Sequence, residues 1–265
     1  MHKGNENDII RIERDEIMKA LITGASSGIG RDMAKYLSKL GYDLVIVARN
    51  RDALENLKNE LKTNVEVVAM DLSQNENCYK LHEQIRDIDI LINNAGFGEF
   101  GNFTETSLEK EISMIQTNIT TLHILTKLYL KDMEEKDKGH ILNVASIAGF
   151  MPGPLMATYY ASKNYVVALT RAIRKELKKK KSNVKLSLLC PGPVNTNFNN
   201  VANVKFKAKG MSSEYVAKYA VDKMLKNKFI IIPGLTIKLT KFFAKIIPSN
   251  IIEEFCYHIQ VAKNK

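Results

Sequence analysis

The sequence predicts an α/β fold in which helices cover both faces of one doubly wound, parallel, seven-stranded sheet within a single domain. Two observations predict it. Short runs of β-branched and aliphatic residues alternate with helix-like stretches, and a glycine-rich turn joins the first run to the first helix. Right-handed crossovers then build a parallel sheet. At 265 residues and 45% hydrophobic composition, the chain can bury one core of this size.

The expected elements follow one another without a repeat or a linker. The expected strands occupy residues 19–23, 43–48, 65–70, 88–92, 140–145, 185–190 and 229–232. The expected helices lie near residues 29–40, 51–62, 75–86, 106–132, 157–181 and 212–226. We therefore expect residues 18–232 to form one domain. The polar residues 1–17 are expected to be a poorly ordered N-terminal extension, and residues 233–265 a helical C-terminal tail.

Composition narrows the class of protein. The three cysteines lack disulfide-like or metal-like spacing, which favours a reducing, cytoplasmic compartment, and the five histidines show no ligand spacing, so we expect no metal site. No uninterrupted apolar segment approaches the ~18–20 residues that span a bilayer. The net charge of +10 attracts polyanions, but runs such as residues 178–181 fall at an expected helix end without interleaved aromatics. We expect no nucleic-acid partner.

The turn after the first expected strand has the composition of a phosphate-binding loop. Glycine allows a tight turn there, lets the backbone approach a pyrophosphate and lets the helix pack on the strand. The N-terminus of the following helix offers N–H groups to the phosphates. Such a turn is often only a tight connection, but its place between strand and helix favours a dinucleotide, as in Rossmann folds. The residues concerned are Gly24, Ser26, Ser27, Gly28, Ile29 and Gly30.

The end of the second strand indicates which dinucleotide is bound. NAD sites place a carboxylate there, whereas the 2′-phosphate of NADP prefers an arginine. Arg49 follows this strand and no acid occurs before Asp52, which favours NADP(H), unless the arginine only solvates a loop. Asp71 and Leu72 follow the third strand and are candidates for contact with the adenine. A lone Asp71 is as often a helix cap, and Ser73 would cap equally well.

Tyr159 and Lys163 are the candidate proton-transferring pair. They stand four positions apart at the head of a long expected helix, so they share one face. A nearby ammonium favours the phenolate, and we expect Lys163 to lower the pKa of Tyr159 from its usual value of ~10. The hydroxyl would then act as an acid or a base near neutral pH. Such a pair is common on protein surfaces, so its specificity depends on the residues around it.

Four features in chain order resemble the short-chain dehydrogenase/reductase family over roughly residues 18–232. They are the glycine turn, the Asn-Asn-Ala-Gly segment at 93–96, a serine thirteen residues before Tyr159, and the Pro-Gly turn at 191–192. The resemblance implies an oxidoreductase with a catalytic tetrad of Asn118, Ser146, Tyr159 and Lys163. It implies cofactor contacts from the glycine turn and from Arg49, Asp71, Leu72, Asn94, Ala95, Gly96, Tyr159, Lys163, Pro191, Gly192, Val194 and Thr196.

The resemblance also implies a mechanism and an assembly. A hydride passes between the nicotinamide and a carbonyl carbon, Tyr159 gives its proton to the developing alkoxide, and Ser146 hydrogen-bonds the same oxygen. Lys163 would hold the nicotinamide ribose, and Asn118 would hold a water that links the lysine to solvent. The two longest helical stretches resemble those through which relatives pair, so we expect a homodimer or homotetramer.

The expected substrate pocket is apolar. Aromatic and aliphatic side chains follow the Asn-Ala-Gly turn and precede Tyr159, and no charge over residues 147–158 could clamp a carboxylate. These side chains favour a hydrophobic ketone or aldehyde, unless some of them only pack the loop. They are Phe97, Phe100, Phe150, Met151, Leu155 and Met156.

The tail allows several interpretations. Apolar residues follow a helical spacing as far as Pro248, with lysines on another side. Such a helix packs on its own domain or on a second subunit, closes the pocket as a lid, or makes weak contact with an anionic membrane. The tail is similar to branches of the family that contain hydroxysteroid and long-chain ketoacyl reductases.

Three functions are compatible with these features of the sequence. The leading hypothesis is an NADPH-dependent reductase of an apolar carbonyl compound. A dehydrogenase that oxidises a hydroxysteroid or a secondary alcohol is the alternative on the same fold. A non-catalytic NADP(H)-binding regulatory protein is the alternative from another class, and such a protein would have little need for a complete tetrad.

Overall fold

Seven parallel strands form the central sheet of the computed structural model, which describes residues 18–202, 210–243 and 246–262. The strand order is β3-β2-β1-β4-β5-β6-β9, and every neighbouring pair is parallel. The strands are β1 (Lys19–Thr23), β2 (Asp43–Ala48), β3 (Val65–Ala69), β4 (Ile90–Asn93), β5 (His140–Val144), β6 (Lys185–Leu189) and β9 (Ile230–Ile231). This confirms the predicted doubly wound α/β sheet.

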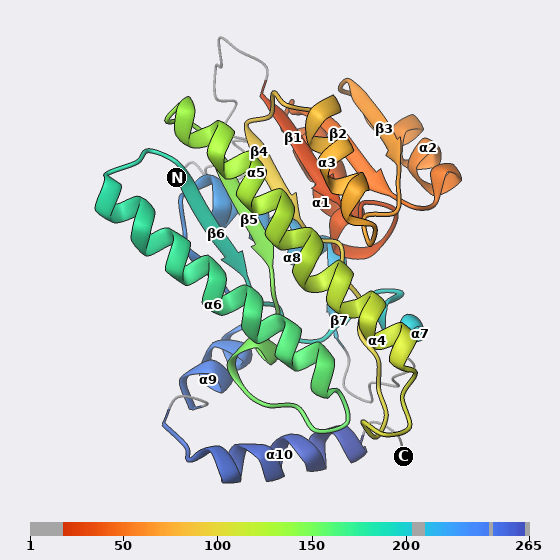
Figure 1. The fold of residues 1–265 in the computed structure, drawn as a ribbon, viewed down its shortest axis with the longest axis vertical. Coiled ribbons are helices and arrows are strands. Elements are labelled where there is room, and N and C mark those ends of the chain that lie inside the picture. The colour runs from red at the N-terminus through yellow and green to blue at the C-terminus, as the bar shows by residue number, and fades with distance from the viewer. Residues whose placement is uncertain (1–17, 203–209, 244–245, 263–265) are drawn as a thin grey trace, which may run out of the picture.

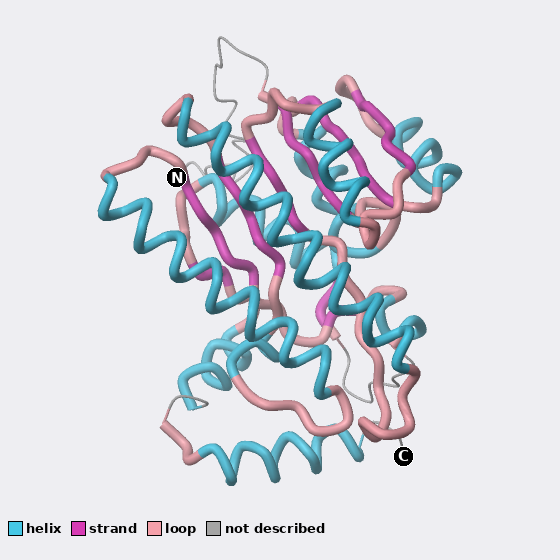
Figure 2. Tube along the Cα trace, in the orientation of Figure 1, coloured by secondary structure: helices cyan, strands magenta, loops and turns pink. Residues whose placement is uncertain are grey.

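Helices cover both faces of the sheet (Figure 1). One face packs against α1 (Gly28–Lys39), α2 (Arg51–Glu60) and α8 (Ser213–Leu225). The other face packs against α3 (Asn75–Gln84), α5 (Leu122–Glu135) and α6 (Ala157–Lys180). Figure 2 shows the strands as one layer between these helices.

The alternation of side chains along each strand divides the core between the two faces. In β1, Ala20 and Ile22 belong to the cluster under α1 and α8, whereas Leu21 belongs to the cluster under α3 and α5. All three are fully buried. A strand covered on both faces has no polar side, which is why the sequence shows continuous apolar runs there.

The order of the strands fixes where a ligand can bind. The chain moves from β1 outward through β2 to β3, then returns to place β4 on the other side of β1. The connections leaving the carboxyl ends of β1 and β4 therefore run in opposite directions. A crevice opens at this point in doubly wound sheets.

Several elements differ from those predicted. The sequence predicts one helix over 106–132, but the structure has α4 (Leu108–Ile115), a π-helical turn (Gln116–Thr121) and then α5. The last predicted strand, 229–232, shortens to two residues. Short elements that the pattern did not indicate are a 3-10 turn (Ile147–Phe150), the paired strands β7 (Val194–Asn195) and β8 (Met211–Ser212), and α7 (Phe198–Val201). Such short elements have too few residues to show a periodicity.

The tail forms α9 (Leu235–Phe243) and α10 (Ser249–Ala262). Both lie at the end of the molecule toward which β5 and β6 point (Figure 1). The predicted N-terminal extension, residues 1–17, lies outside the described residues.

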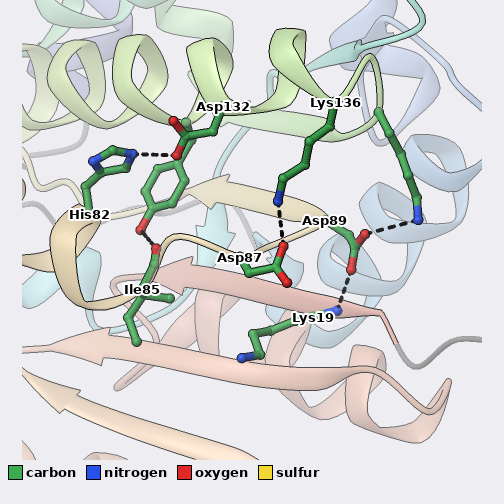
Figure 3. A network of polar contacts seen from close by, with 9 residues as sticks. Lys19, His82, Ile85, Asp87, Asp89, Asp132 and Lys136 are labelled. Carbon is green, nitrogen blue, oxygen red and sulfur yellow. Dashed lines mark hydrogen bonds and ion pairs between the residues drawn. The ribbon is translucent and has the colours of Figure 1, made fainter.

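A polar network fastens the opposite end of the sheet (Figure 3). The backbone N–H of Lys19 donates to the carboxylate of Asp89 at 2.9 Å, which joins the beginning of β1 to the segment before β4. On α5 the buried hydroxyl of Tyr129 donates to the carbonyl of Ile85 at 2.7 Å. These contacts lie away from the carboxyl edge, so they stabilise the fold without contributing to the crevice.

The Tyr129 bond gives a test of this separation. Tyr129→Phe leaves the buried carbonyl of Ile85 without its donor, so we expect the free energy of unfolding to fall by about 1–3 kcal/mol. Urea unfolding followed by circular dichroism measures it. Tyr79→Phe, at a half-exposed tyrosine of α3, is the matched control and should change little. Equal stability of the two variants would contradict the importance of the bond.

Candidate active site

A cavity of about 870 Å³ lies at the carboxyl ends of the strands, in the predicted crevice. It collects nearly all of the site residues predicted from the sequence. Those in its wall are Gly24, Ser26, Ser27, Gly28, Ile29, Arg49, Asp71, Leu72, Asn94, Ala95, Gly96, Ser146, Tyr159, Lys163, Pro191, Gly192, Val194 and Thr196. Gly30 and Asn118 do not line the cavity, but both contact residues that do.

The glycine turn leaves no space for side chains. Gly24 and Gly28 have φ of +67° and +56°, values that disfavour other residues. A Cβ at Gly24 would lie 2.8 Å from the Cα of Ala95, and one at Gly30 would lie 2.5 Å from the carbonyl oxygen of Gly24. Gly30 therefore allows α1 to pack against the turn and does not face the cavity.

The N-terminus of α1 is open toward the cavity. Ser27 is the N-cap, but its side chain makes no capping bond, and the first turn carries no acidic residue. The first N–H groups of a helix have no partner within the helix, and the dipole makes this end partly positive. An uncapped end beside a glycine turn fits a phosphate.

Thr23 and Asn94 hold the turn in place. The Thr23 hydroxyl oxygen accepts from the backbone N–H groups of Asn94 and Ala95 at 3.0 and 3.1 Å. The Asn94 amide nitrogen donates to the carbonyls of Thr23 and Gly24 at 3.0 and 3.1 Å. Both donors of this amide are used within the protein, so the side chain of Asn94 supports the turn from the side.

Arg49 and Asp71, which were predicted to contact the adenosine half of a dinucleotide, both line the cavity. Arg49 follows β2, is exposed and lines the cavity, whereas its neighbour Arg51 pairs with Glu55 at 3.6 Å. The Asp71 carboxylate accepts from the backbone N–H of Ser73 at 3.0 Å. Neither Asp71 nor Ser73 caps α3, because that helix begins at Asn75.

Ser146, Tyr159 and Lys163 meet in the cavity. Ser146 follows β5 and caps the 3-10 turn, where its hydroxyl accepts from the N–H of Ala148 at 3.2 Å. Its hydroxyl also hydrogen-bonds that of Tyr159. The Lys163 ammonium lies 5.8 Å from the centre of the Tyr159 ring, on the same face of α6, and donates to the carbonyl of Val144 at 3.0 Å.

The pKa values of this pair differ from the prediction. Burial raises the pKa of Tyr159 to about 12, against the opposite effect of the hydrogen bond from Ser146. Burial also lowers the pKa of Lys163 to about 8. The predicted lowering of the tyrosine pKa by the lysine is thus not found in this structure. The reason is that loss of water penalises both charged forms, and the ammonium stands beside the ring and the Val144 carbonyl.

Asn118 lies within the π-helical turn and is almost fully buried. Its amide oxygen accepts from the N–H of Phe97 at 3.0 Å, and its amide nitrogen donates to the Phe97 carbonyl at 2.9 Å and the Ser162 hydroxyl at 3.1 Å. The side chain thus fixes the segment after β4 against α6. A Cβ at Gly96 would lie 2.8 Å from the Asn118 amide oxygen and 3.4 Å from the Lys163 ammonium, so only glycine fits between them.

The apolar side of the cavity matches the prediction in part. Phe97 and Met156 line it, but the predicted residues Phe100, Phe150, Met151 and Leu155 do not. Phe100 and Phe150 instead pack in neighbouring apolar clusters. Sequence reasoning missed Phe198, which lies against the ring of Tyr159 with the ring centres 5.3 Å apart. Phe198 belongs to a four-residue helix that no periodicity could reveal.

Tyr160, next to the candidate acid, also lines the cavity and is held by the tail. The fully buried Gln260 of α10 donates to its hydroxyl at 2.9 Å. The backbone of Gly153 lies so close to the Tyr160 ring that a Cβ there would be 2.2 Å away. The tail therefore braces the wall of the cavity from outside.

No group of His, Cys, Asp or Glu that could hold a metal ion occurs among the described residues. None of the described helices has the length and apolar character needed to cross a membrane.

The fold is a doubly wound α/β sheet with a cavity at its carboxyl edge, and comparison with known families identifies the family. Residues 18–205 match the short chain dehydrogenase family. The chain belongs to this family of oxidoreductases.

Similar proteins are described as oxidoreductases or short-chain dehydrogenases. An uncharacterized oxidoreductase of Staphylococcus epidermidis is 37% identical over 182 residues, which cover 67% of this chain and 78% of that protein. Among solved structures, a short-chain dehydrogenase of Sphingobium yanoikuyae in complex with NADPH has a TM-score of 0.77 at 29% identity and covers 83% of this chain and 89% of its own.

Two further solved structures are similar at lower sequence identity. A short-chain dehydrogenase/reductase of Burkholderia phymatum in complex with NAD has a TM-score of 0.77 at 26% identity, with 86% and 92% of the chains covered. A bulky-bulky ketone specific alcohol dehydrogenase of Comamonas testosteroni has a TM-score of 0.73 at 26% identity, with 88% and 95% covered.

The buried lysine predicts a dependence of stability on pH. Between about pH 8 and its ordinary pKa of 10.5, Lys163 is protonated in the unfolded chain but not in the folded one. Stability contributed by this site therefore rises with pH in this window. From pH 8 to 9.5 we expect wild type to gain about 2 kcal/mol relative to Lys163→Met, which lacks the titrating group. Urea unfolding at both values measures the difference, and a difference that stays constant would contradict the lowered pKa.

Proposed function

We propose that this protein is an NADP(H)-dependent oxidoreductase that transfers a hydride between nicotinamide and a carbonyl or secondary alcohol, and that it reduces an apolar ketone or aldehyde. The observation that carries the proposal is the meeting of Ser146, Tyr159 and Lys163 in the same cavity as the open N-terminus of α1. A phosphate-binding end and a proton-transferring end in one cavity are the two halves that such a reaction requires.

The residues of the cavity fit a dinucleotide. The uncapped helix end and the glycine turn would hold the pyrophosphate, and Arg49 would hold a 2′-phosphate. Lys163 would hold the nicotinamide ribose, since its ammonium lies in the cavity wall between Tyr159 and β5. The bound cofactor would supply or accept the hydride.

The protein's own residues would manage the proton and the substrate oxygen. The Tyr159 hydroxyl donates a proton to the developing alkoxide, and the Ser146 hydroxyl donates a hydrogen bond to the same oxygen. Lys163 has a pKa of about 8, so its side chain is still protonated at neutral pH. When a negative charge forms on a neighbouring oxygen, this ammonium stabilises the charge, whereas burial destabilises it. Asn118 positions Lys163, because it fixes the backbone of Phe97 against α6, the helix that carries the lysine.

The preference for NADP(H) rests on Arg49. It lines the cavity directly after β2 and no carboxylate precedes it there. The similar structures do not decide the matter, since one contains NADPH and another NAD. The forked guanidinium matches a phosphate, to which it can donate two hydrogen bonds.

The apolar substrate rests on the walls around the reacting groups. Phe97, Met156 and Phe198 line the cavity near Tyr159, and the 3-10 turn after Ser146 carries no charge. The similar alcohol dehydrogenase of Comamonas testosteroni is described as specific for bulky-bulky ketones. An aromatic and aliphatic pocket of this kind favours such a molecule over a carboxylate or a sugar.

A homodimer or homotetramer is part of the same proposal. Leu108, Ile112 and Ile115 form an exposed apolar stripe on α4, within the stretch expected to pair with a second copy. A cytoplasmic location is also proposed, because the three cysteines, Cys78, Cys190 and Cys256, are buried and form no disulfide with one another, as is usual in a reducing compartment.

Turnover tests the assigned acid. NADPH consumption is measured against a panel of ketones and aldehydes, and NADP⁺ reduction against secondary alcohols and hydroxysteroids. We expect Tyr159→Phe to lose about 10²–10⁴-fold in turnover while it retains NADPH binding, because only the proton donor is removed. Tyr165→Phe, six positions along the same helix and bonded to His123 at 2.7 Å, is the control and should keep its activity.

Three outcomes separate the candidate functions. Faster turnover of the alcohols would favour the oxidative dehydrogenase. NADPH binding by wild type without turnover in either direction would favour a non-catalytic regulatory protein. Turnover that survives Tyr159→Phe would refute the role of the phenol.

Cofactor affinity tests Arg49. Arg49→Ala should weaken NADPH binding by about 10–100-fold, the range of one charge-assisted contact, and leave NADH binding unchanged. Arg51→Ala removes an arginine two positions away that pairs with Glu55, and it should affect neither cofactor. Fluorescence titration measures the dissociation constants. Equal losses for NADPH and NADH in Arg49→Ala would contradict recognition of the 2′-phosphate.

A further inference from the structure

The large hydrophobic side chains that the structure leaves exposed are concentrated in the tail. Of the sixteen found among the residues whose exposure the structure describes, nine lie between residues 235 and 259, although this segment is a small part of the chain. Scattered exposed hydrophobics are ordinary, but a continuous group marks a surface that another apolar phase covers. The nine are Leu235, Leu239, Phe243, Ile246, Ile247, Ile251, Phe255, Tyr257 and Ile259.

In α9 three apolar residues face away from the protein. Ile237 packs on the backbone of Gly192, where a Cβ would lie 2.4 Å from its terminal carbon. Leu235, Leu239 and Phe243 are spaced four apart, on the side opposite Ile237, and Leu235 is 73% exposed. The helix is therefore held by one apolar side while it presents another.

In α10 an exposed apolar stripe lies beside the buried one. Cys256 and Gln260 pack inward, and the sulfur of Cys256 lies 3.5 Å from that of Met151. Ile251, Phe255 and Ile259 are also four apart, one position before the buried residues, and Phe255 is 61% exposed. Both exposed stripes thus belong to consecutive helices at the same end of the molecule (Figure 1).

The charge on α9 and on the segment that follows it is positive. Residues 233–252 contain three lysines and no acidic residue, and Lys238 is exposed on α9. α10 carries no lysine, and its Glu253 is two positions from both Ile251 and Phe255, which places this carboxylate on the far side of the helix from the stripe. Glu254 pairs with His258 at 2.8 Å. Two exposed apolar stripes, one of them flanked by lysine on α9, suit the boundary of an anionic lipid layer, where ammonium groups reach the headgroups.

We infer that α9 and α10 form a docking surface for an anionic membrane. A second copy of the chain would also bury apolar residues, but the net charge of +10 makes two copies repel one another as a whole. Lipid headgroups instead supply the opposite charge, and acyl chains cover the stripes. The inference goes beyond the proposed reaction and does not require it.

Vesicle binding tests the surface with the full chain. The purified protein is sedimented with vesicles of phosphatidylcholine alone and with vesicles containing phosphatidylglycerol. We expect binding to the anionic vesicles, much weaker binding to the neutral ones, and loss of binding in high salt. The readout does not involve turnover, so its failure is distinct from failure of the proposed function.

Substitutions locate the contact. Leu239→Glu and Phe255→Glu should each lower the partition constant by about tenfold or more, the loss expected for one buried apolar side chain. Lys238→Glu should remove the preference for phosphatidylglycerol and leaves the apolar stripes intact. Tyr79→Glu introduces the same charge at a half-exposed aromatic of α3 and should bind as wild type does. Circular dichroism establishes that each variant is folded.

Two results would overturn the inference. One is a wild-type protein that does not sediment with anionic vesicles, or sediments equally with both kinds. The other is a change in oligomeric mass, measured by light scattering without lipid, in Leu239→Glu and Phe255→Glu but not in Tyr79→Glu. That second result would assign the surface to another copy of the chain.

Discussion

The close approach of the Gly24 turn to the end of β4 is the constraint on which the carboxyl edge of the sheet depends. The Cα of Ala95 occupies the space where a side chain of residue 24 would project, and the amide of Asn94 is bonded to both Thr23 and Gly24. The turn, the beginning of α1 and the Asn-Ala-Gly segment therefore form one rigid unit. This unit sets the distance from the helix N-terminus to Ser146 and Tyr159 across the cavity.

Burial dominates the electrostatics on the other side of that cavity. It shifts the pKa of Tyr159 upward and that of Lys163 downward, so both groups favour their neutral forms more than they would in water. Two hydroxyls and an ammonium in a partly dry site are poised to stabilise a new negative charge on an oxygen between them. The Val144 carbonyl keeps the ammonium within reach of that position.

The features that could be predicted from the sequence are those that local chemistry dictates. Continuous apolar runs, the glycine turn and the four-residue step from Tyr159 to Lys163 each require particular residues at particular spacings, and the sheet and most of the cavity wall follow from them. Phe198 and Gln260 could not be found in this way. Phe198 contacts Tyr159 from a four-residue helix, and Gln260 contacts Tyr160 from the distant tail. Both contacts depend on the tertiary fold, which the spacing of residues along the chain does not indicate.

The direction in which the pKa of Tyr159 shifts could not be predicted from the sequence, for a related reason. A spacing of four residues places an ammonium near a phenol, but it does not report how much water surrounds either group. The structure supplies that information, and it reverses the predicted direction of the shift.

The wide turn at Gln116–Thr121 has a consequence for the rotational phase of the helices it joins. It contains one residue more than an α-helical turn needs, so α4 and α5 are offset by about 100° relative to a continuous helix. This offset lets Met114 face the core while Leu108 and Ile112 face outward. Removing a single residue from the turn would swing α4 around its own axis and carry Met114 away from the interior. Insertions and deletions at this point therefore act as a rotation of a whole helix.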